Sequence, residues 1–458
     1  MPENGLRPAL LDRLEARRSR VAVIGLGYVG LPLAVAAARA GHTVVGIDAD
    51  ADRVTKVNRG LSHVEDVEDS AVAGLLGERR LSASTSYSAA AGCDVAVIAV
   101  PTPIDRHRVP NLSYVRSAAG SIAAALAPGS LIVLESTTYP GTTEEVIVPA
   151  LEQRGLRPGR DVFVGYSPER IDPSNGRFTI ANTPKVISGL TEDCLQATAA
   201  FYATFVERLV PVSSLKAAEI TKLFENIFRV VNIALANEFQ VICDRFGIDV
   251  WEVIDACSTK PYGYLAFYPG PGLGGHCVPV DPFYLAWKAR EVRAQTEFIE
   301  LAGRINAAVP DYVVGKVAAA LNSRQRSLSG SSVGILGVAY KKNTRDVRES
   351  PAVPIVEQLL AAGATISYHD PHVPEFPVKG AVLRSEPLTA EYLSAQDCVL
   401  IVADHDAIDW GLVGANARTV VDTRNTLKKV SSPFTAQLAA DAALTLGAAH
   451  EPRRVGLP

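Results

Sequence analysis

The stretch GPGLGGHCVPVDPF, residues 270–283, places a cysteine between an imidazole and a carboxylate. Cys277 follows His276 directly, and Asp281 lies four residues further along the chain. A cysteine in this setting could be a metal ligand, half of a disulfide, a small buried hydrophobe or a nucleophile. The adjacent histidine can lower the pKa of the thiol, which favours a nucleophile.

The glycines near this cysteine allow the backbone to approach other groups closely and leave N–H groups exposed; they are Gly272, Gly274 and Gly275. A packed core cysteine usually lies on a regular element rather than in such a loop. The spacing of His276, Cys277 and Asp281 is not that of zinc ligands, so we predict no metal site.

A second group of chemistry-bearing residues lies on one predicted helix. Residues 215–245 contain no glycine or proline, and Lys222, Asn226 and Arg229 share a face at i, i+4 and i+7. The rest of this helix is apolar almost all round, which is typical of a buried helix and would also suit a subunit interface. Buried polar groups need partners, so the three side chains could contact a charged ligand or form internal ion pairs; a solvated stripe is the alternative.

A third group predicts a dinucleotide site. VAVIGLGYVGLPLAVAAARAGHTVVGID reads as strand, turn, helix and strand, with G-x-G-x-x-G at Gly25, Gly27 and Gly30. The first glycine permits a tight turn, the second lets the backbone approach a pyrophosphate, and the third lets the helix pack closely. Asp48 ends the second strand, where a carboxylate binds ribose hydroxyls and repels a 2′-phosphate, so the pattern favours NAD over NADP.

Other residues near this turn are candidate cofactor contacts. Arg53 tempers the preference for NAD, because an arginine near Asp48 could accept a phosphate. Two further strand-like runs end in loops that would line the cofactor crevice. The candidates from the turn and these loops are Tyr28, Val29, Pro101, Thr102 and Thr137.

The last third of the chain echoes the first. SSVGILGVAY and GATISYHDP repeat the strand and glycine pattern, with Leu336-Gly337 in the place of Ile24-Gly25. Ten additional residues put a basic run at the C-terminal end of a parallel strand, where open α/β sheets bind ligands. A basic run is often only a solvated loop, but its position predicts a second phosphate site; its members are Lys341, Lys342, Arg345 and Arg348.

Composition excludes several classes of protein. The chain has 458 residues, 48% hydrophobic and 21% charged, and a net charge of -4, which gives no general reason to expect nucleic acid or membrane binding. Six cysteines without a C-x-x-C pair indicate a reducing compartment. The basic and apolar N-terminal run resembles a signal peptide, but its glycines fit a Rossmann strand and turn, so we expect a cytoplasmic protein.

These elements predict an α/β protein with two Rossmann-like doubly wound parallel-sheet domains joined by a central helical domain with one long helix. We expect the NAD-binding domain at residues 19–214, the helical domain with the cysteine loop at 215–322, and the second nucleotide-type domain at 331–440. Residues 1–18 and 441–458 are expected to be poorly ordered.

Motifs along most of the chain resemble the UDP-sugar 6-dehydrogenase family. In chain order they are GLGYVGLPLA, VPTP, ESTTYPGTTEE, SPERIDPSN, AEITKLFENIFRVVNIALANE, GPGLGGHCVPVDPFYL and RDVRESPA. That family oxidises the C6 alcohol of a UDP-sugar to a carboxylate with two NAD. The resemblance implies a UDP-binding C-terminal domain and a homodimer formed through the long helix.

The resemblance also implies the catalytic roles. A thiolate at Cys277 would trap the aldehyde as a thiohemiacetal, and a second hydride transfer would give a thioester that water hydrolyses. Lys222 and Asn226 would stabilise the oxyanion at C6. Glu169 of SPER matches the acid/base of the thioester stage, and Asp281 would position water or tune the lysine.

Further positions match ligand contacts of the family. We include Gly274 of the cysteine loop among the substrate-binding candidates; the others are Arg170, Ile171, Arg229, Lys341 and Arg424. Arg348 matches a cofactor contact made across the domain cleft.

One departure bears on the substrate. UDP-glucose dehydrogenases typically have lysine immediately before the aspartate of the cysteine motif, where this chain has Val280. HCVPVDPFYL and ENIFRVVNIALANE look more like the UDP-N-acetylhexosamine branch. This favours UDP-N-acetylglucosamine, with UDP-N-acetylmannosamine, UDP-N-acetylgalactosamine and UDP-glucose as alternatives.

Two other classes compete with this interpretation. A nucleotide-sugar epimerase needs a Tyr-x-x-x-Lys pair beside the nicotinamide, and Tyr284 and Lys288 have that spacing but lie outside the first nucleotide domain. A non-catalytic NAD sensor would not need Cys277, Lys222 and Asn226 together.

Overall fold

The computed structural model describes residues 6–105, 109–171, 177–275 and 280–431. The chain divides into two compact units, one of residues 1–231 with 277–301 and the other of residues 232–276 with 302–458. The predicted nucleophile Cys277 and its neighbour His276 lie outside the described residues.

The first unit is built on an eight-stranded sheet with the order β3-β2-β1-β4-β5-β6-β7-β8. Its strands are β1 Arg20–Ile24, β2 Thr43–Ile47, β3 Leu81–Ser84, β4 Val95–Ile98, β5 Leu131–Leu134, β6 Phe163–Tyr166, β7 Lys185–Gly189 and β8 Leu209–Pro211. Neighbouring strands are parallel except β6 and β7, which pair antiparallel. The central order, with β1 between β2 and β4, is that of a doubly wound sheet.

Alternate residues of each strand enter two separate cores. Ala22 and Ile24 of β1 pack in one cluster, and Val21 and Val23 pack in the other, as the two-residue period of a strand requires. Helices therefore cover both faces; they are α2 Gly30–Arg39, α3 Ala51–Asn58, α4 Asp69–Gly77, α5 Ser113–Ala125, α6 Val148–Glu152, α7 Glu192–Tyr202 and α10 Asp281–Ala289. Short helical turns lie at Tyr87–Ala90, Thr143–Ile147 and Arg290–Val292.

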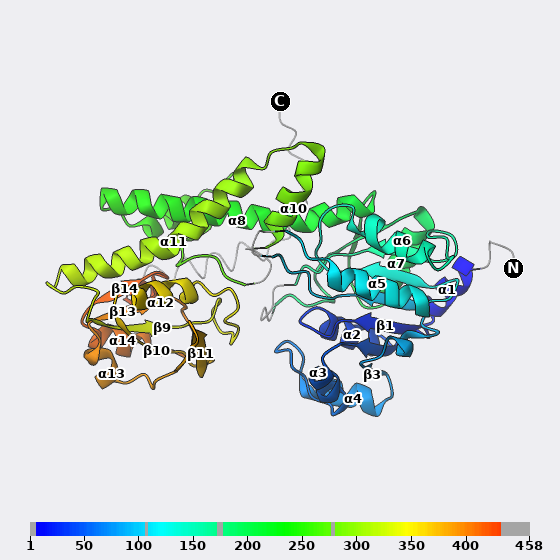
Figure 1. The fold of residues 1–458 in the computed structure, drawn as a ribbon, viewed down its shortest axis with the longest axis horizontal. Helices are drawn as coiled ribbons and strands as arrows, with labels where there is room; N and C mark the ends of the chain where they lie inside the picture. Colours follow the sequence, from blue (N-terminus) through cyan, green and yellow to red (C-terminus); the bar gives the residue numbers. More distant parts are fainter. Residues whose placement is uncertain (1–5, 106–108, 172–176, 276–279, 432–458) are drawn as a thin grey trace. The chain divides into compact units, whose positions relative to one another are not determined.

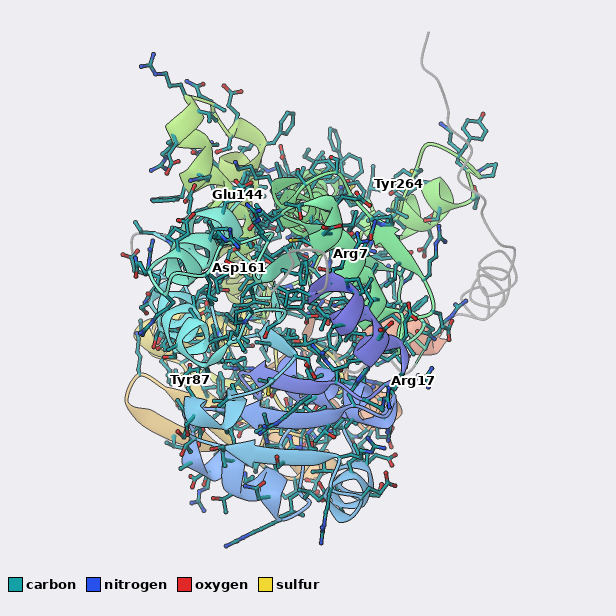
Figure 2. All side chains as sticks on the ribbon, turned by 90° about the vertical axis from the view of Figure 1, so that its right-hand side faces the viewer. Arg7, Arg17, Tyr87, Glu144, Asp161 and Tyr264 are labelled. Carbon is teal, nitrogen blue, oxygen red and sulfur yellow. The ribbon has the colours of Figure 1, made fainter. Side chains whose placement is uncertain are left out.

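The expectation that residues 1–18 are poorly ordered is wrong for residues 6–15. They form α1 (Leu6–Glu15), whose Leu10 and Leu14 are fully buried in the core that also contains α7. Arg7, labelled in Figure 2, pairs with Asp193 of α7. This helix was missed because its two core side chains find their partners far away in the sequence.

Two long helices stand out in Figure 1, α8 (Leu215–Phe246) of 32 residues and α11 (Glu297–Asn322) of 26 residues. The prediction of one helix over 215–245 is confirmed. Of the two alternatives for its apolar surface, burial within the chain does not account for every position. Phe224 is 67% exposed and Leu235 is 60% exposed, so one apolar face of α8 meets solvent in the single chain. Among the described residues, no helix is long and apolar enough to cross a membrane.

The second unit contains a four-stranded parallel sheet with the order β10-β9-β13-β14. Residues of α11 and α12 pack in one core against this sheet, and α13, α14 and α15 contribute to another (Figure 1). The elements are α9 Val250–Ser258, β9 Ser332–Leu336, α12 Ala352–Ala361, β10 Thr365–His369, β11 Glu375–Val378, β12 Ala381–Arg384, α13 Ala390–Ala395, β13 Cys398–Ile401, α14 Trp410–Asn416, β14 Val420–Asp422 and α15 Thr426–Ser431. The predicted fold class, with two parallel-sheet domains and a helical region between them, is confirmed.

The two sheets share one turn geometry, as their sequences suggested. Gly25 after β1 and Gly337 after β9 both have positive φ, at 91° and 75°, which a glycine adopts without strain. The next amide donates in each case to the aspartate that follows the neighbouring strand, Leu26 to Asp48 and Val338 to Asp370, both at 2.7 Å.

Candidate active site

The glycine turn after β1 has room for a ligand on one side. A Cβ atom on Gly30 would lie 1.7 Å from the carbonyl oxygen of Gly25, so only glycine allows α2 to begin this close to the turn. A Cβ atom on Gly27 would meet nothing within 4 Å. The open position lies just before the N-terminus of α2, where free N–H groups and the helix dipole favour a pyrophosphate.

Asp48 closes the other end of this site and is 8% exposed. One of its oxygens accepts the amide of Leu26 at 2.7 Å, and the other accepts the amide of Asp50 at 2.9 Å. Arg53 lies 3.5 Å from the Asp48 carboxylate and 3.4 Å from that of Asp50. Two carboxylates therefore surround this guanidinium, which disfavours a 2′-phosphate here.

The loops after β4 and β5 lie side by side because these strands pair in parallel. They carry Thr102 and Thr137, the two predicted nicotinamide-side contacts. The hydroxyl of Tyr284 donates to the carbonyl oxygen of Thr102 at 2.8 Å, which fixes α10 to the first loop. Lys288 instead pairs with Glu145 and Glu291, at 2.6 and 2.8 Å. Tyr284 and Lys288 therefore serve as structural contacts, unlike the pair that an epimerase needs.

Three predicted catalytic residues meet where α8 faces the start of α10. The Asn226 amide donates to Asp281 Oδ2 at 2.5 Å, and both residues are only 4% exposed. Burial raises the pKa of Asp281 to about 7, against the charge of Lys222 and the hydrogen bond from Asn226. The arrangement holds an amide and an ammonium beside one buried carboxyl group. Arg229, predicted on the same face, is exposed.

The SPER loop orients a carboxylate through its own backbone. Oε1 of Glu169 accepts the amides of Arg170 and Ile171, each at 2.7 Å. The Arg170 guanidinium pairs with Glu225 of α8 at 2.6 Å and donates to the carbonyl oxygen of Pro184 at 2.6 Å. The loop is therefore joined to α8, the helix that carries Lys222 and Asn226.

The sequence did not single out a group of buried charges behind this loop. Lys185 lies 3.0 Å from Glu135 and 3.6 Å from Glu169, and Tyr202 donates to Glu135. Glu135 belongs to the ESTT motif, which was noted for its threonines. Lys185 lies in no motif, and only a buried strand that begins with a lysine could have drawn attention to it.

A second buried carboxylate, Glu219, was also missed. It accepts the amide and the hydroxyl of Thr143 at 2.9 and 2.7 Å, and the amide of Gly141 as well. Burial raises its pKa to about 7, although these hydrogen bonds lower it. Glu219 precedes Lys222 by three residues, so it ties the loop that follows Thr137 to the same turn of α8.

In the second unit the glycine loop packs against protein. A Cβ atom on Gly274 would come within 2.7 Å of Tyr340 Cβ, and one on Gly275 within 3.0 Å of the Tyr340 ring. A Cβ atom on Gly270 would lie 3.0 Å from the Arg424 guanidinium, which donates through Nε to Val402 O at 2.9 Å. These glycines thus have a packing reason within the chain, besides the predicted approach to a ligand.

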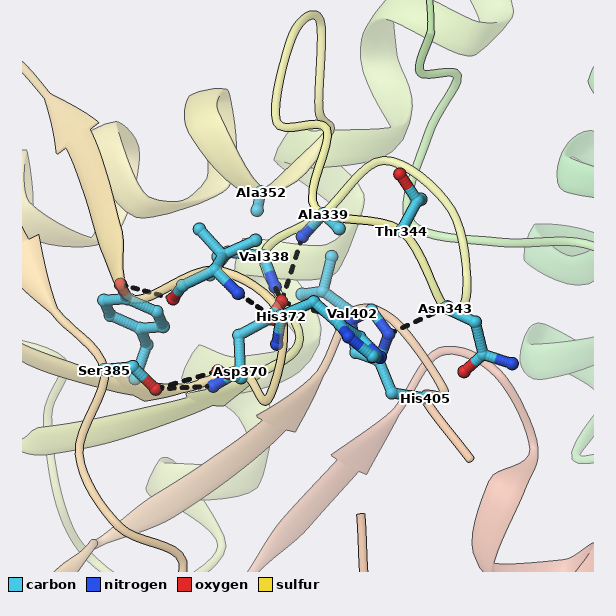
Figure 3. Close-up of polar contacts among 12 residues, drawn as sticks. Val338, Ala339, Asn343, Thr344, Ala352, Asp370, His372, Ser385, Val402 and His405 are labelled. Carbon is cyan, nitrogen blue, oxygen red and sulfur yellow. Dashed lines mark hydrogen bonds and ion pairs between the residues drawn. The ribbon is translucent and has the colours of Figure 1, made fainter. Parts of the chain in front are cut away.

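The basic loop after β9 is held by a buried carboxylate and imidazole. Figure 3 shows Asp370 accepting the amides of Val338 and Ala339 and facing His405, whose Nε2 lies 3.1 Å from Oδ2. The amide of Asn343 donates to Nδ1 of His405 at 2.9 Å. This anchors the segment that carries Lys341.

Two cations of this predicted phosphate site already have acidic partners. Lys342 pairs with Asp406 at 2.5 Å, and the guanidinium of Arg348 forms two hydrogen bonds with Asp346. Across the residues that the structure describes, no three or more His, Cys, Asp or Glu side chains are grouped as metal ligands.

Three family models match the chain in order. Residues 19–206 match the NAD binding domain of the UDP-glucose/GDP-mannose dehydrogenase family, residues 216–308 its central domain, and residues 334–429 its UDP binding domain.

Relatives with several substrates resemble the chain to similar degrees. The UDP-N-acetyl-D-glucosamine 6-dehydrogenase of Pseudomonas aeruginosa is 38% identical over 77% of this chain and 83% of its own length. The UDP-N-acetyl-D-mannosamine dehydrogenase of Pyrococcus horikoshii is 33% identical over 90% of this chain and 96% of its own. A solved structure of a UDP-D-ManNAc dehydrogenase from Pyrococcus horikoshii superimposes with a TM-score of 0.82 at 33% identity, covering 89% of this chain and 96% of that one.

Proposed function

This chain belongs to the UDP-glucose/GDP-mannose dehydrogenase family of NAD-dependent oxidoreductases, and from that premise we propose that it is a UDP-N-acetyl-D-glucosamine 6-dehydrogenase. In this reaction the C6 alcohol of the sugar becomes a carboxylate in two oxidations at one site. The contact between Asn226 and Asp281 beside Lys222 carries the proposal, since it gathers the donors that such a reaction needs.

NAD fits the turn after β1. The open position at Gly27 leaves space for a pyrophosphate, and Asp48 lies where a ribose would bind. NAD supplies the acceptor for the hydride that leaves C6 in each oxidation. The nicotinamide side of the proposed site is lined by Pro101, Thr102 and Thr137. Tyr284 holds the loop that carries Thr102 in place.

Lys222 and Asn226 stabilise the oxygen at C6 as negative charge develops on it. They are four residues apart on α8 and so share one face of this helix. Asp281 accepts the hydrogen bond of the Asn226 amide and interacts with the charge of Lys222. A proton leaves the C6 hydroxyl for water in the first oxidation, and the Lys222 ammonium stabilises the oxygen that remains.

Cys277 supplies the covalent step. Its sulfur adds to the C6 aldehyde and forms a thiohemiacetal, and loss of the second hydride from C6 leaves a thioester. Water then adds to the thioester carbonyl, the C–S bond breaks, and the thiolate is restored. Glu169 takes the proton from that water, and its carboxylate is held for this by the amides of Arg170 and Ile171.

The N-acetylhexosamine substrate is favoured by Val280. An apolar side chain that packs against the core stands where UDP-glucose dehydrogenases typically carry lysine. The relative from Pseudomonas aeruginosa, at 38% identity, supports UDP-N-acetylglucosamine. The second candidate is UDP-N-acetylmannosamine, which the relative from Pyrococcus horikoshii supports. We assign the UDP moiety to the second unit, where Gly274, Lys341 and Arg424 are candidates.

We also propose a homodimer formed through α8. Seven exposed apolar residues recur at spacings of three, four and seven along this helix, which is the pattern of a helix–helix interface. They are Ile220, Phe224, Phe228, Leu235, Phe239, Ile242 and Phe246. A cytoplasmic location agrees with the free thiols of the five described cysteines.

A panel of UDP-sugars tests the substrate. Purified protein with NAD is offered UDP-N-acetylglucosamine, UDP-N-acetylmannosamine, UDP-N-acetylgalactosamine and UDP-glucose, and kcat/KM is measured from NADH formation. The highest kcat/KM is expected with UDP-N-acetylglucosamine. A higher value with UDP-N-acetylmannosamine would identify that sugar as the substrate. No NADH with any of the four UDP-sugars would contradict the proposed function.

A further inference from the structure

A buried ammonium lies directly behind Glu169. The Lys185 side chain is 6% exposed and sits between two carboxyl groups, Glu135 at 3.0 Å and Glu169 at 3.6 Å. The ring of Tyr202 lies 5.0 Å from Nζ on another side. A lysine is rarely buried so fully, because removing its charge from water costs several kcal/mol unless partners compensate.

The sheet topology brings this lysine to Glu169. β7 runs antiparallel to β6, with Tyr166 opposite Ser188 and Gly165 opposite Gly189. Continuing that register past the end of β6 sets Glu169 opposite Lys185, the first residue of β7. Because β5 and β6 are parallel, Glu135, which directly follows β5, lies at the same edge.

The contacts of the two carboxyl groups differ. Both oxygens of Glu169 are directed, Oε1 by the amides of Arg170 and Ile171 and Oε2 by Lys185. Glu135 is fully buried; its Oε1 faces Lys185 and Tyr202, and its Oε2 has no hydrogen-bond partner among the described residues. A bare buried oxygen is costly on an ionised carboxylate and much less so on a neutral acid.

The charges follow from these contacts. One ammonium and two carboxyls are electrically neutral only when one carboxyl keeps its proton. Burial raises the pKa of Glu135, so this is the carboxyl that keeps it. Burial alone would lower the pKa of Lys185, but the attraction of Glu135 and Glu169 raises it, so the ammonium stays charged. Its positive charge is then available to Glu169.

We propose that Lys185 is a positioning residue for thioester hydrolysis. It provides the counter-charge of the Glu169 carboxylate and fixes the direction of Oε2 of Glu169. This rests on the proposed function, since Glu169 acts as a base in hydrolysis only if a thioester forms. Lys185 forms and breaks no bond itself. Within the described part of the chain, the other titratable groups that face Glu169 are Glu135 after β5 and Tyr202 of α7, while Arg170 is paired with Glu225 of α8.

Two variants separate this role from a purely structural one. Lys185→Met leaves two carboxyl groups facing each other with no cation between them, which lowers the stability of this variant. Lys185→Met combined with Glu135→Gln replaces the neutral acid with a neutral amide, so that no second carboxyl group can ionise or share a proton with Glu169. The double variant leaves only Glu169 without its partner. Lys185→Arg keeps the charge, and Lys216→Met, at a 58% exposed lysine, is the matched control.

Rapid mixing of each enzyme with NAD and UDP-N-acetylglucosamine is the test, with NADH absorbance and intact protein mass as readouts. In the double variant we expect a fast burst of two NADH per site, a steady rate about a hundredfold below wild type, and a covalent adduct that accumulates. Lys185→Arg should recover most of the rate, and Lys216→Met should match wild type.

The double variant overturns the inference if it turns over at the wild-type rate with no adduct, because Glu169 then acts without the charge of Lys185. A variant that loses the burst and the steady rate alike, with an unchanged melting temperature, also contradicts a role confined to hydrolysis. Wild-type enzyme that forms no NADH from any UDP-sugar would instead remove the proposed function, independently of the variants.

Discussion

At the scale of single residues, the site depends on carboxyl groups whose proton affinity is set by burial. Asp281 and Glu219 both have a pKa raised to about 7. Asp281 contacts Asn226 of α8, and Glu219 lies on α8 three residues before Lys222. An ordinary carboxylate would be fully ionised at neutral pH. These two groups can instead change protonation near neutral pH, which suits acid/base chemistry.

Asp281→Asn tests this in the stability of the protein. Between pH 3.8 and about 7 the folded chain keeps a proton on Asp281 that the unfolded chain has lost, so the free energy of unfolding falls as pH rises through this window. Asparagine does not titrate and removes that loss. Chemical denaturation measures the free energy of unfolding of the variant minus that of wild type. This difference should be at least about 1 kcal/mol more positive at pH 8 than at pH 5. Its turnover should fall, and a stability difference independent of pH would contradict the assignment.

The sequence predicted residues whose contacts lie within one short segment, and it did not predict residues whose contacts come from distant segments. Gly25, Gly30 and Asp48 belong to one strand–turn–helix–strand unit, so their spacing alone predicted their placement. Lys185 meets its partners only because β7 reverses direction beside β6, and no nearby pattern signals that reversal. The exposure of Arg229 could not be read from helical spacing, because spacing gives a face but not what covers it.

At the scale of elements, the turn between β1 and α2 carries the cofactor site. Its second glycine differs from the other two because no atom of the described residues lies within 4 Å of a Cβ atom placed on it. Gly25 needs its positive φ, and Gly30 needs the close approach to Gly25, so both are required by the fold. Only Gly27 is left to be explained by a ligand.

Gly27→Ala should therefore separate binding from folding. We expect an unchanged melting temperature without cofactor, because the new methyl group meets no protein atom within 4 Å. The Kd for NAD should rise at least about tenfold, since the methyl group occupies the pyrophosphate position. Calorimetric titration measures the Kd, and Gly74→Ala, at another glycine with open space, is the matched control. An NAD affinity equal to wild type would contradict this location of the cofactor.

Elements that depend on distant partners were harder to predict. The long helix α8 was predicted because it lacks helix-breaking residues, and the strands with their glycine turns were predicted from continuous apolar runs. The helix α1 was missed, since Leu10 and Leu14 are core residues only through the cluster they share with α7. The close packing of Gly274 on Tyr340 joins segments 66 residues apart, which the glycine pattern alone could not reveal.

At the scale of the whole molecule, the apolar face of α8 predicts the oligomeric state. Phe224, Leu235 and Phe246 are 67%, 60% and 75% exposed in the single chain. Large apolar side chains aligned on one face of a long helix are typical of an interface. A dimer would bury them and would also support the helix that carries Lys222 and Asn226.

Two charged substitutions on this face test the dimer. Leu235→Lys with Phe239→Lys should convert the dimer to a monomer, as measured by sedimentation equilibrium. Val382→Lys, at a residue 59% exposed on β12, introduces a charge elsewhere and should leave the assembly unchanged. A wild-type monomer, or a double variant that sediments as a dimer, would place the interface elsewhere or remove it.

The central claim is a four-electron oxidation that passes through a thioester on Cys277. Its most direct test is the amount of NADH formed for each UDP-N-acetylglucosamine consumed, with the product identified by mass, in wild-type enzyme and in Cys277→Ser. We expect two NADH and one uronate for each sugar with wild type, and no uronate turnover with the variant. One NADH for each sugar with release of the aldehyde, or full turnover by Cys277→Ser, would contradict it.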